Sequence, residues 1–458
     1  MRYDKRYLTL FAVMALSACG RPSAPAQTAQ PSQTVLETLE NREAALIDRS
    51  TAYLEEFFSG QFGHFYEEAG EALKTDLPQT QAEQEWSVIF AQARAYRETL
   101  STQAVPRDGK TEVQLITVHA RYNLQTTFVY GEHDTVEALS FQLKPLIVIP
   151  QSNERWEEIP ITLGYDPDKP LNGMLTLPEH VQNPPIAILV HGSGPQGMDS
   201  LIGAADNRPF ADLAHGLADR GIASIRYDKR SYVYPEDVTD IETEYLYDVK
   251  DAVRFAMEEP RVDGDRLYLI GHSQGGMLSP KLAQDNPEFK GLVSLGGTLR
   301  RMEDIILEQH ETMMAQDTTL TEEEKNSHIS QIKEELQQVS GLSPESPDDR
   351  KELLLGYPVS YWISLNAIDS KKIAGELTIP MLILQGDNDF QVLYRTDFML
   401  WQEVLKDREN VSFHHYPGLS HVFMPGSLER FDSSSYDPPA NMDAQVIEDI
   451  AEWIQGQP

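Results

Sequence analysis

Cysteine is nearly absent from this chain. Among its 458 residues there is one, Cys19, so no disulfide can form within the chain, and the fold rests on packing and polar contacts alone. The lack of further thiols suits a protein that is exported from the reducing cytoplasm.

Basic residues are also scarce. Lys and Arg together number 38 against 72 Asp and Glu, which gives a formal net charge of −34. Nucleic-acid binding requires a basic surface, so we expect no nucleic-acid partner. The same charge disfavours electrostatic attachment to anionic lipid and indicates instead a well-solvated acidic surface.

An apolar run near the start of the chain is short. Residues 1–19 have a basic beginning, an apolar stretch at 8–16 and small residues up to Cys19. This is the layout of a secretory signal peptide, and the stretch is too short to cross a membrane as a helix. Residues 16–19, LSAC, resemble the lipobox of bacterial lipoproteins. The resemblance implies lipidation of Cys19 and an extracytoplasmic protein anchored to a bacterial membrane, while an ordinary signal peptide with an incidental cysteine is the alternative.

Two segments of different composition follow. Residues 20–39 are rich in Pro, Ala, Gln, Ser and Thr and have too little apolar surface to order themselves, which predicts a flexible linker. In residues 40–150, helical spacing of apolar positions gives way to alternation, which predicts a small α+β domain. Helices are expected at residues 44–58, 62–73 and 82–99, and strands at 112–122, 124–130 and 136–143.

The small domain resembles the nuclear transport factor two-like type found before hydrolase domains in some bacterial exported proteins. The similarity rests on the aromatic opening at residues 57–62 (FFSGQF), on Trp86 and on the closing strand at 136–141. The three histidines of this segment are scattered, and no catalytic constellation is evident. A spacer or binding role is therefore expected, with a cell-envelope ligand left open.

From residue 153 to 458 the sequence alternates between short apolar runs and amphipathic stretches of helical length. An antiparallel pair of strands is expected first, followed by buried parallel strands separated by helices. The alternation predicts a doubly wound, mostly parallel α/β sheet. Strands are expected at residues 155–163, 173–177, 186–190, 222–227, 267–270, 291–295, 381–385 and 411–416, and helices at 208–220, 243–258, 276–283, 394–406 and 444–454.

The sequence GHSQG at residues 271–275 lies between an apolar strand and a helix. Gly-x-Ser-x-Gly in that setting is a nucleophile elbow, a sharp turn that presents the Ser273 hydroxyl at a helix N-terminus. Gly271 and Gly275 are expected where side chains would clash with the neighbouring strand and helix. The helix N-terminus favours the negative charge that develops when a carbonyl is attacked.

Two later motifs follow the elbow in the chain order of one enzyme family. GDND at residues 386–389 follows a predicted strand, and YPGLSH at residues 416–421 follows the last predicted strand. Together with the elbow and the strand–helix alternation, they make residues 153–458 similar to the α/β-hydrolase fold, in which the catalytic triad runs in the order Ser, acid, His.

The resemblance implies a role for each triad residue. Ser273 is the expected nucleophile, His421 the base that activates it, and Asp389 the acid that orients the imidazole. Asp387 competes for the acid role, and the family spacing favours Asp389. Asp387 is then expected to cap a turn.

An oxyanion hole needs two N–H groups that face the developing negative oxygen. One is the backbone N–H of Gln274, directly after the nucleophile. By resemblance the other is that of Ser193, in the loop HGSGP at residues 191–195 after an early strand. The alternative is that this loop is merely a turn.

An insertion at about residues 299–378 has helical character, with helices expected at 301–315, 321–339 and 351–366. In the α/β-hydrolase fold an insertion at this place is a cap over the active site. Its apolar residues are expected to line a pocket for an acyl chain or an aromatic group, with packing inside the cap as the alternative. These residues are Met302, Ile305, Ile306, Met313, Met314, Tyr361, Trp362 and Leu365. Removing the cap should therefore change substrate preference more than the chemistry.

The sequence as a whole predicts a serine hydrolase acting on a small-molecule ester or acylated substrate. A serine peptidase or aminopeptidase that cleaves amides has the same motifs, and a non-catalytic cell-surface binding protein is a further alternative. No grouping has metal-ligand spacing, so neither a metal nor a cofactor is expected. The basic stretch at residues 226–230 (RYDKR) predicts a structural ion-pair cluster, with substrate contact as the alternative.

Overall fold

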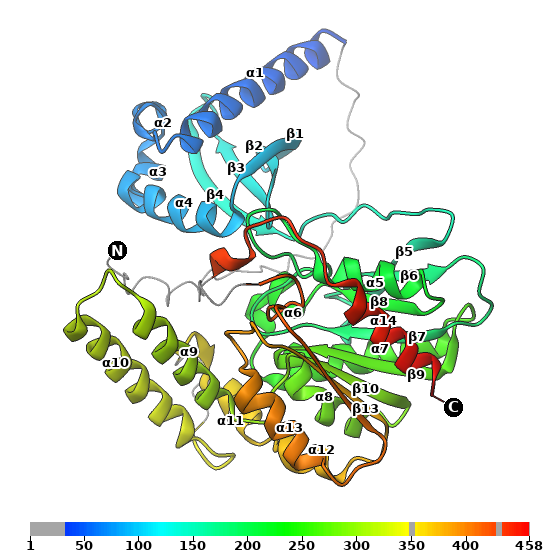
Figure 1. Ribbon diagram of the computed structural model, residues 1–458. Coiled ribbons are helices and arrows are strands. Elements are labelled where there is room, and N and C mark those ends of the chain that lie inside the picture. Colours follow the sequence, from blue (N-terminus) through cyan, green and yellow to red (C-terminus); the bar gives the residue numbers. More distant parts are fainter. Residues whose placement is uncertain (1–32, 348–352, 427–432, 458) are drawn as a thin grey trace. The chain divides into compact units, whose positions relative to one another are not determined.

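The computed structural model describes residues 33–347, 353–426 and 433–457 (Figure 1). Of these residues, those up to Val148 and those from Ile149 onward form two compact units, each with its own hydrophobic core. The expected signal peptide, Cys19 and residues 20–32 of the expected linker lie outside the described residues. Within the described ranges, no helix combines the length and the apolar character needed to span a bilayer.

The first unit packs helices against a four-stranded antiparallel sheet, in agreement with the predicted α+β class. Buried aromatic rings, among them Phe57 and Trp86, fill the space between the helices and the sheet. The helices are α1 (Gln33–Phe58), α2 (Gly63–Glu68), α3 (Glu71–Asp76) and α4 (Gln79–Ala93). The strands are β1 (Tyr96–Arg107), β2 (Lys110–His119), β3 (Asn123–Tyr130) and β4 (Val136–Lys144), in that spatial order.

Several boundaries in this unit differ from the sequence prediction, and the helix expected at residues 62–73 is divided into α2 and α3. Helix α1 begins at Gln33, so residues 33–39 are helical although a flexible linker was expected there. The helix expected to run to residue 99 ends at Ala93, because Arg94 takes a positive φ of 68° that no α-helix continues. The following segment pairs antiparallel with β2 as strand β1. Nearly all of its side chains are exposed, so it lacks the alternation that identifies a half-buried strand.

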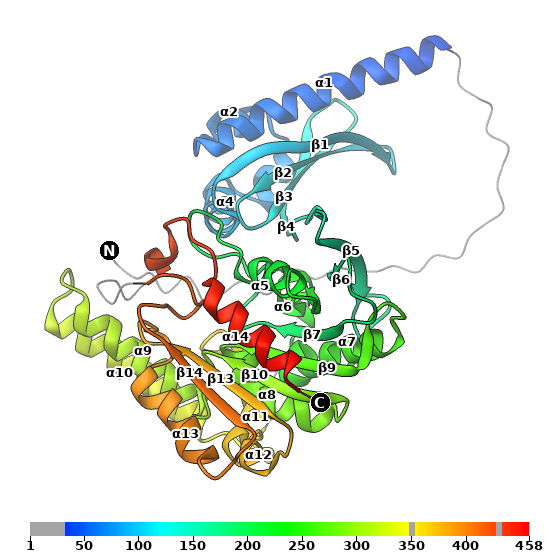
Figure 2. The same ribbon diagram turned by 45° about the vertical axis from the view of Figure 1, so that its right-hand side comes forward.

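The second unit is built on an eight-stranded sheet in the order β14-β13-β10-β9-β7-β8-β6-β5. Strand β6 runs antiparallel to both of its neighbours, β5 and β8, and the remaining neighbours in this sheet are parallel (Figure 2). This is the predicted doubly wound, mostly parallel sheet. The strands are β5 (Trp156–Leu163), β6 (Leu171–Pro178), β7 (Pro185–Val190), β8 (Ala223–Tyr227), β9 (Asp263–His272), β10 (Phe289–Leu295), β13 (Met381–Gly386) and β14 (Val411–Tyr416).

Helices cover both faces of this sheet, so its central strands are apolar on both sides. In β7, Ile186 and Ile188 belong to the core beneath α7 and α8, while Ala187 and Leu189 pack with α5 and α14. A continuous apolar run was therefore a sound signal for this strand. The covering helices are α5 (Pro209–Ala218), α7 (Tyr247–Glu258), α8 (Gln274–Asp285), α13 (Met399–Leu405) and α14 (Ala444–Gln455). Short turns of helix are α6 (Arg230–Val233), η2 (Pro235–Asp237), η3 (Glu242–Leu246), η4 (Tyr394–Phe398) and η5 (Ser433–Tyr436).

The cap insertion follows β10. Helices α9 (Met302–Gln316) and α10 (Glu322–Ser340) lie side by side as a hairpin (Figures 1 and 2). Where a helix was expected over residues 351–366, the described part forms a small hairpin and a shorter helix. These are β11 (Leu353–Leu354), β12 (Tyr357–Pro358) and α11 (Val359–Asn366), followed by α12 (Ser370–Glu376). Gly356 takes a φ of 83° in the turn between the two strands, which a helix does not allow.

Candidate active site

Ser273 lies at a sharp corner between β9 and α8. Its backbone has a φ of 55° and a ψ of −116°, an unfavourable region for a residue with a side chain. Two hydrogen bonds hold this conformation: Ser273 N donates to Leu295 O at 2.9 Å, and Ser273 O accepts from Met277 N at 2.8 Å. The Ser273 side chain stays partly exposed, whereas its two chain neighbours are buried.

The glycines on either side of Ser273 allow the corner to be this tight. A Cβ at Gly271 would lie 2.3 Å from the carbonyl oxygen of Gly275. A Cβ at Gly275 would lie 2.5 Å from the carbonyl oxygens of both Val190 and His191. These obstacles are backbone atoms, which cannot move aside as a flexible side chain can, so neither position tolerates a larger residue.

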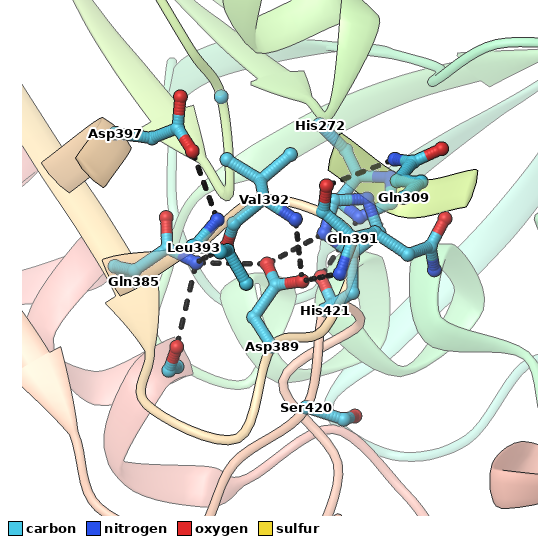
Figure 3. A network of polar contacts seen from close by, with 12 residues as sticks. His272, Gln309, Gln385, Asp389, Gln391, Val392, Leu393, Asp397, Ser420 and His421 are labelled. Atoms are coloured by element: carbon cyan, nitrogen blue, oxygen red, sulfur yellow. Dashed lines mark hydrogen bonds and ion pairs between the residues drawn. The ribbon is translucent and has the colours of Figure 1, made fainter. Parts of the chain in front are cut away.

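His421 and Asp389 lie against each other at the carboxyl end of the sheet (Figure 3). His421 Nδ1 is 2.7 Å from Asp389 Oδ2, and both side chains are almost completely buried. His421 is in the loop after β14, and Asp389 is in the loop after β13. A buried carboxylate so close to Nδ1 keeps the proton on that nitrogen and leaves Nε2 free to act as a base.

The Asp389 carboxylate accepts further hydrogen bonds (Figure 3). Its Oδ1 accepts from the backbone N–H groups of Gln391 and Val392 at 2.8 and 2.9 Å. Its Oδ2 accepts from Gln385 Nε2 at 2.7 Å. These donors compensate the cost of burying a polar group and fix the position of the carboxyl group.

Asp387, the competing candidate, has a different partner. Its Oδ1 accepts from the backbone N–H of Gly418 at 2.6 Å and so ties two loops together. Of the two carboxylates, it is Asp389 that contacts the imidazole of His421.

Residues next to Ser273 contact His421. His272 Nε2 lies 3.0 Å from the carbonyl oxygen of His421, and the two rings are 4.7 Å apart. Burial lowers the pKa of His272 to about 3, so this neighbour is neutral at pH 7. A Cβ at Gly296 would lie 3.2 Å from His421 Nδ1, and Leu295, which precedes it, accepts the hydrogen bond of Ser273 N. The fold thus gathers serine, histidine and aspartate at one edge of the sheet.

The loop after β7 passes directly beside Ser273. A Cβ at Gly192 would lie 2.9 Å from Ser273 Cβ, which explains the need for glycine there. Ser193 is exposed, and its carbonyl accepts from Gln196 Nε2 at 2.9 Å. His191 braces the loop by a contact of 3.1 Å from its Nε2 to the carbonyl oxygen of Gly197. The predicted oxyanion loop therefore lies next to the elbow.

The basic stretch at residues 226–230 forms buried ion pairs, as expected. Arg226 contacts Glu158 and Asp199 at 2.6 and 2.8 Å, and Arg230 contacts Asp248 at 2.7 Å. Lys229 does more than the sequence indicated: its Nζ donates to the carbonyl oxygens of Gly192 and Gly194, at 2.9 and 3.1 Å. In the sequence, the signal for this contact with the loop was the position of Lys229, a charged residue shortly after a buried strand, at the carboxyl end of the sheet.

Many of the expected pocket-lining residues of the cap are core residues of this unit. Ile305, Met314, Trp362 and Leu365 are buried. Trp362 and Leu365 belong to the main core of the unit, against which Met302 and Ile306 pack. Within residues 33–347, 353–426 and 433–457, no group of three or more His, Cys, Asp or Glu side chains is arranged to hold a metal ion.

Comparison with known proteins places the second unit in a family. A family model described as serine aminopeptidase, S33, matches residues 206–425. Esterase EstD of Thermotoga maritima is 33% identical over 303 residues, which span 66% of this chain and 68% of the relative. Among solved structures, Est1E of Butyrivibrio proteoclasticus is 21% identical, with a TM-score of 0.41 over 65% of this chain and 98% of that one. Because the chain is 33% identical to EstD over 68% of that relative, it belongs to the α/β-hydrolase family.

Proposed function

We propose that this protein is an extracytoplasmic serine hydrolase that cleaves carboxylic esters through an acyl-enzyme. The observation that carries the proposal is that a strained, partly exposed Ser273 follows His272, which contacts the buried His421 of the His421–Asp389 pair. The similarity to esterase EstD favours an ester as the scissile bond.

In the first half of the reaction, Ser273 becomes acylated. His421 Nε2 takes the proton of the Ser273 hydroxyl while Oγ bonds to the carbonyl carbon, and the electrons of the C=O bond move to its oxygen. The N–H groups of Ser193 and Gln274 donate to this oxyanion. When the C=O bond re-forms, the C–O bond to the alcohol breaks, and the alcohol oxygen takes the proton from His421.

In the second half, water replaces the alcohol. His421 takes a proton from water, whose oxygen bonds to the acyl carbon, and the second oxyanion is held by the same two N–H groups. As this intermediate collapses, the bond to Ser273 breaks, Oγ regains its proton from His421, and the carboxylic acid leaves. Asp389 stays ionised throughout and stabilises the imidazolium form of His421.

The reaction is tested with purified protein on p-nitrophenyl acetate, butyrate and octanoate. The proposal expects turnover that Ser273→Ala reduces by at least about a thousandfold, as loss of a nucleophile does. Ser340→Ala, on cap helix α10, is the control and keeps wild-type activity. Equal turnover by wild type and Ser273→Ala would contradict the proposal.

Amide hydrolysis is the second candidate, because the matching family model is described as serine aminopeptidase. The same triad serves both bonds, and the leaving group decides between them. Amino-acid p-nitroanilides assayed beside the esters separate the two. A larger kcat/KM on the anilides than on the best ester would favour the peptidase.

The proposed location rests on the signal-peptide layout and on Cys19. Lipidation of Cys19 would hold the protein on the outer side of a bacterial membrane. In cells expressing the full chain, labelled palmitate should enter the wild-type protein and be lost in Cys19→Ser, which should move to the soluble fraction. Labelling that survives the substitution would contradict the anchor.

A further inference from the structure

Five buried polar side chains form a closed ring beside the nucleophile. Lys229 follows β8, Glu244 and Tyr245 lie in η3, Gln274 begins α8, and Tyr361 comes from α11 of the cap. Each is at most 4% exposed. Burying polar side chains this deeply costs folding free energy unless each of them finds a partner. The ring supplies those partners within the fold.

An ion pair and four hydrogen bonds link the five side chains one after another into a closed ring. Lys229 Nζ is 2.9 Å from Glu244 Oε1 and donates to the Tyr245 hydroxyl at 2.6 Å. The Tyr245 hydroxyl lies 3.0 Å from Gln274 Oε1. Gln274 Nε2 donates to the Tyr361 hydroxyl at 2.9 Å, and that hydroxyl donates to Glu244 Oε2 at 2.6 Å. Tyr361 therefore joins the residue after the nucleophile to the buried ion pair.

The ring also holds the predicted oxyanion loop. The Gly192 carbonyl oxygen accepts from Lys229 Nζ at 2.9 Å and lies 2.7 Å from the Tyr245 hydroxyl. In a trans peptide the carbonyl and the next N–H point in opposite directions, so these contacts fix the direction of the Ser193 N–H. The other predicted donor belongs to Gln274, whose side chain is itself a member of the ring.

We propose that Tyr361 is a positioning residue, through which the cap closes the ring that orients the oxyanion-hole N–H groups of Ser193 and Gln274. The inference rests on the proposed function, since it assigns these groups their catalytic task. It gives the cap a part in the chemistry itself. It also replaces the expectation that Tyr361 only lines a pocket for the substrate.

The substitution Tyr361→Phe isolates this role. It removes the hydroxyl but keeps the aromatic group of residue 361, which stacks on Tyr357 with ring centroids 4.3 Å apart. Gln274 Nε2 then loses its acceptor and Glu244 Oε2 loses its donor, each inside a buried site where water cannot easily replace them. The Gln274 side chain and the Lys229–Glu244 ion pair must then readjust. The Gly192 carbonyl, which Lys229 holds, readjusts with them.

The test measures kcat and KM on p-nitrophenyl acetate, butyrate and octanoate for wild type and Tyr361→Phe, well below the melting temperature of both. Loss of one oxyanion-hole donor costs about a hundredfold or more in kcat, and a misplaced donor less, so we expect a fall of about tenfold. KM should change less than twofold. The fall should be the same for all three esters, and labelling by a fluorophosphonate should slow in parallel.

Two comparisons separate positioning from stability. Tyr416→Phe is the matched control: it also removes a hydroxyl that donates to a carboxylate, that of Asp449 at 2.7 Å, and it should keep wild-type kcat. Gln274→Met removes the same side-chain bond from the other end. If the two act through one ring, the double variant should lose no more than the worse single variant.

Three results would overturn the inference. One is a kcat of Tyr361→Phe within twofold of wild type, and another is a loss that grows with acyl-chain length, which would make Tyr361 a lining residue. The third is full additivity with Gln274→Met. A wild-type protein that neither turns over esters nor reacts with the probe would instead contradict the proposed function.

Discussion

His421 Nδ1 and Asp389 Oδ2 lie 2.7 Å apart, and both side chains are shielded from water. The carboxylate also accepts two backbone N–H bonds, from Gln391 and Val392, so it cannot swing away from the imidazole. A fixed anion at Nδ1 sets the tautomer of the imidazole and stabilises its protonated form. The proposed mechanism depends on this contact, and a single substitution at Asp389 is enough to perturb it.

Replacing Asp389 by Asn should lower kcat by about a thousandfold or more, because an amide placed at Nδ1 favours the wrong tautomer of His421. The fold should survive, since the amide oxygen can still accept from the loop. Asp387→Asn is the matched comparison: Asp387 Oδ1 accepts from Gly418 N and not from His421, so activity should fall less than about tenfold. Steady-state kinetics on p-nitrophenyl butyrate measures both, and equal losses would contradict the assignment of Asp389 as the acid.

Gly275→Ala should destabilise the protein although alanine favours a helix. The gain from removing a helical glycine is at most about 1 kcal/mol. The new Cβ would lie 2.5 Å from two backbone oxygens, and such overpacking costs about 1–3 kcal/mol or more. Gly375→Ala in α12, where nothing lies within 4 Å, is the control and should be neutral or slightly stabilising. Thermal denaturation compares the two, and an unchanged melting temperature for Gly275→Ala would mean that the corner is looser than described.

Glu158 should make stability depend on pH in acid. Burial alone would raise the pKa of Glu158, but hydrogen bonds from His215 and from Gln151 N, together with the Arg226 charge, lower it to about 2. The unfolded chain therefore binds a proton at this group between about pH 4.5 and 2, whereas the folded chain does not. The stabilisation is fully present above pH 4.5 and is lost as the pH falls through that window.

Glu158→Gln tests this coupling. The variant should be less stable than wild type at pH 7, because Arg226 loses one of its two buried anionic partners. Its melting temperature should then fall less between pH 4.5 and 3 than that of wild type. Glu179→Gln, at an exposed position, serves as control and should follow wild type. A variant curve parallel to wild type would show that Glu158 does not carry the effect.

Much of the larger unit could be predicted because its central strands are buried on both faces. Continuous apolar runs such as residues 186–190, which lie in β7, are bounded by turn residues and separated by helical lengths. Strand β1 was missed because its side chains are largely exposed, and pairing with β2 rather than burial makes it a strand. The start of α1, residues 33–39, was missed because these residues were grouped with the segment before them, which is rich in Pro, Ala, Gln and Ser.

At the candidate site, the family spacing indicated Asp389 rather than Asp387 as the partner of His421, but local motifs did not show how the loops bring these residues together. Asp387 and Asp389 are two residues apart, and only the path of the loop brings one to His421 and the other to Gly418. Tyr361 is a plausible pocket residue by composition. Its contact with Gln274, 87 positions away, depends on how the cap folds back, which no local pattern contains.

The central claim is that Ser273 is the nucleophile, and its most direct test is covalent. A fluorophosphonate reacts with an activated serine to form a stable phosphonyl ester, and peptide mass spectrometry locates the adduct. We predict one adduct, on the peptide that contains Ser273, absent in Ser273→Ala and slowed in Asp389→Asn. A folded protein that remains unlabelled, or an adduct on another serine, would contradict the account.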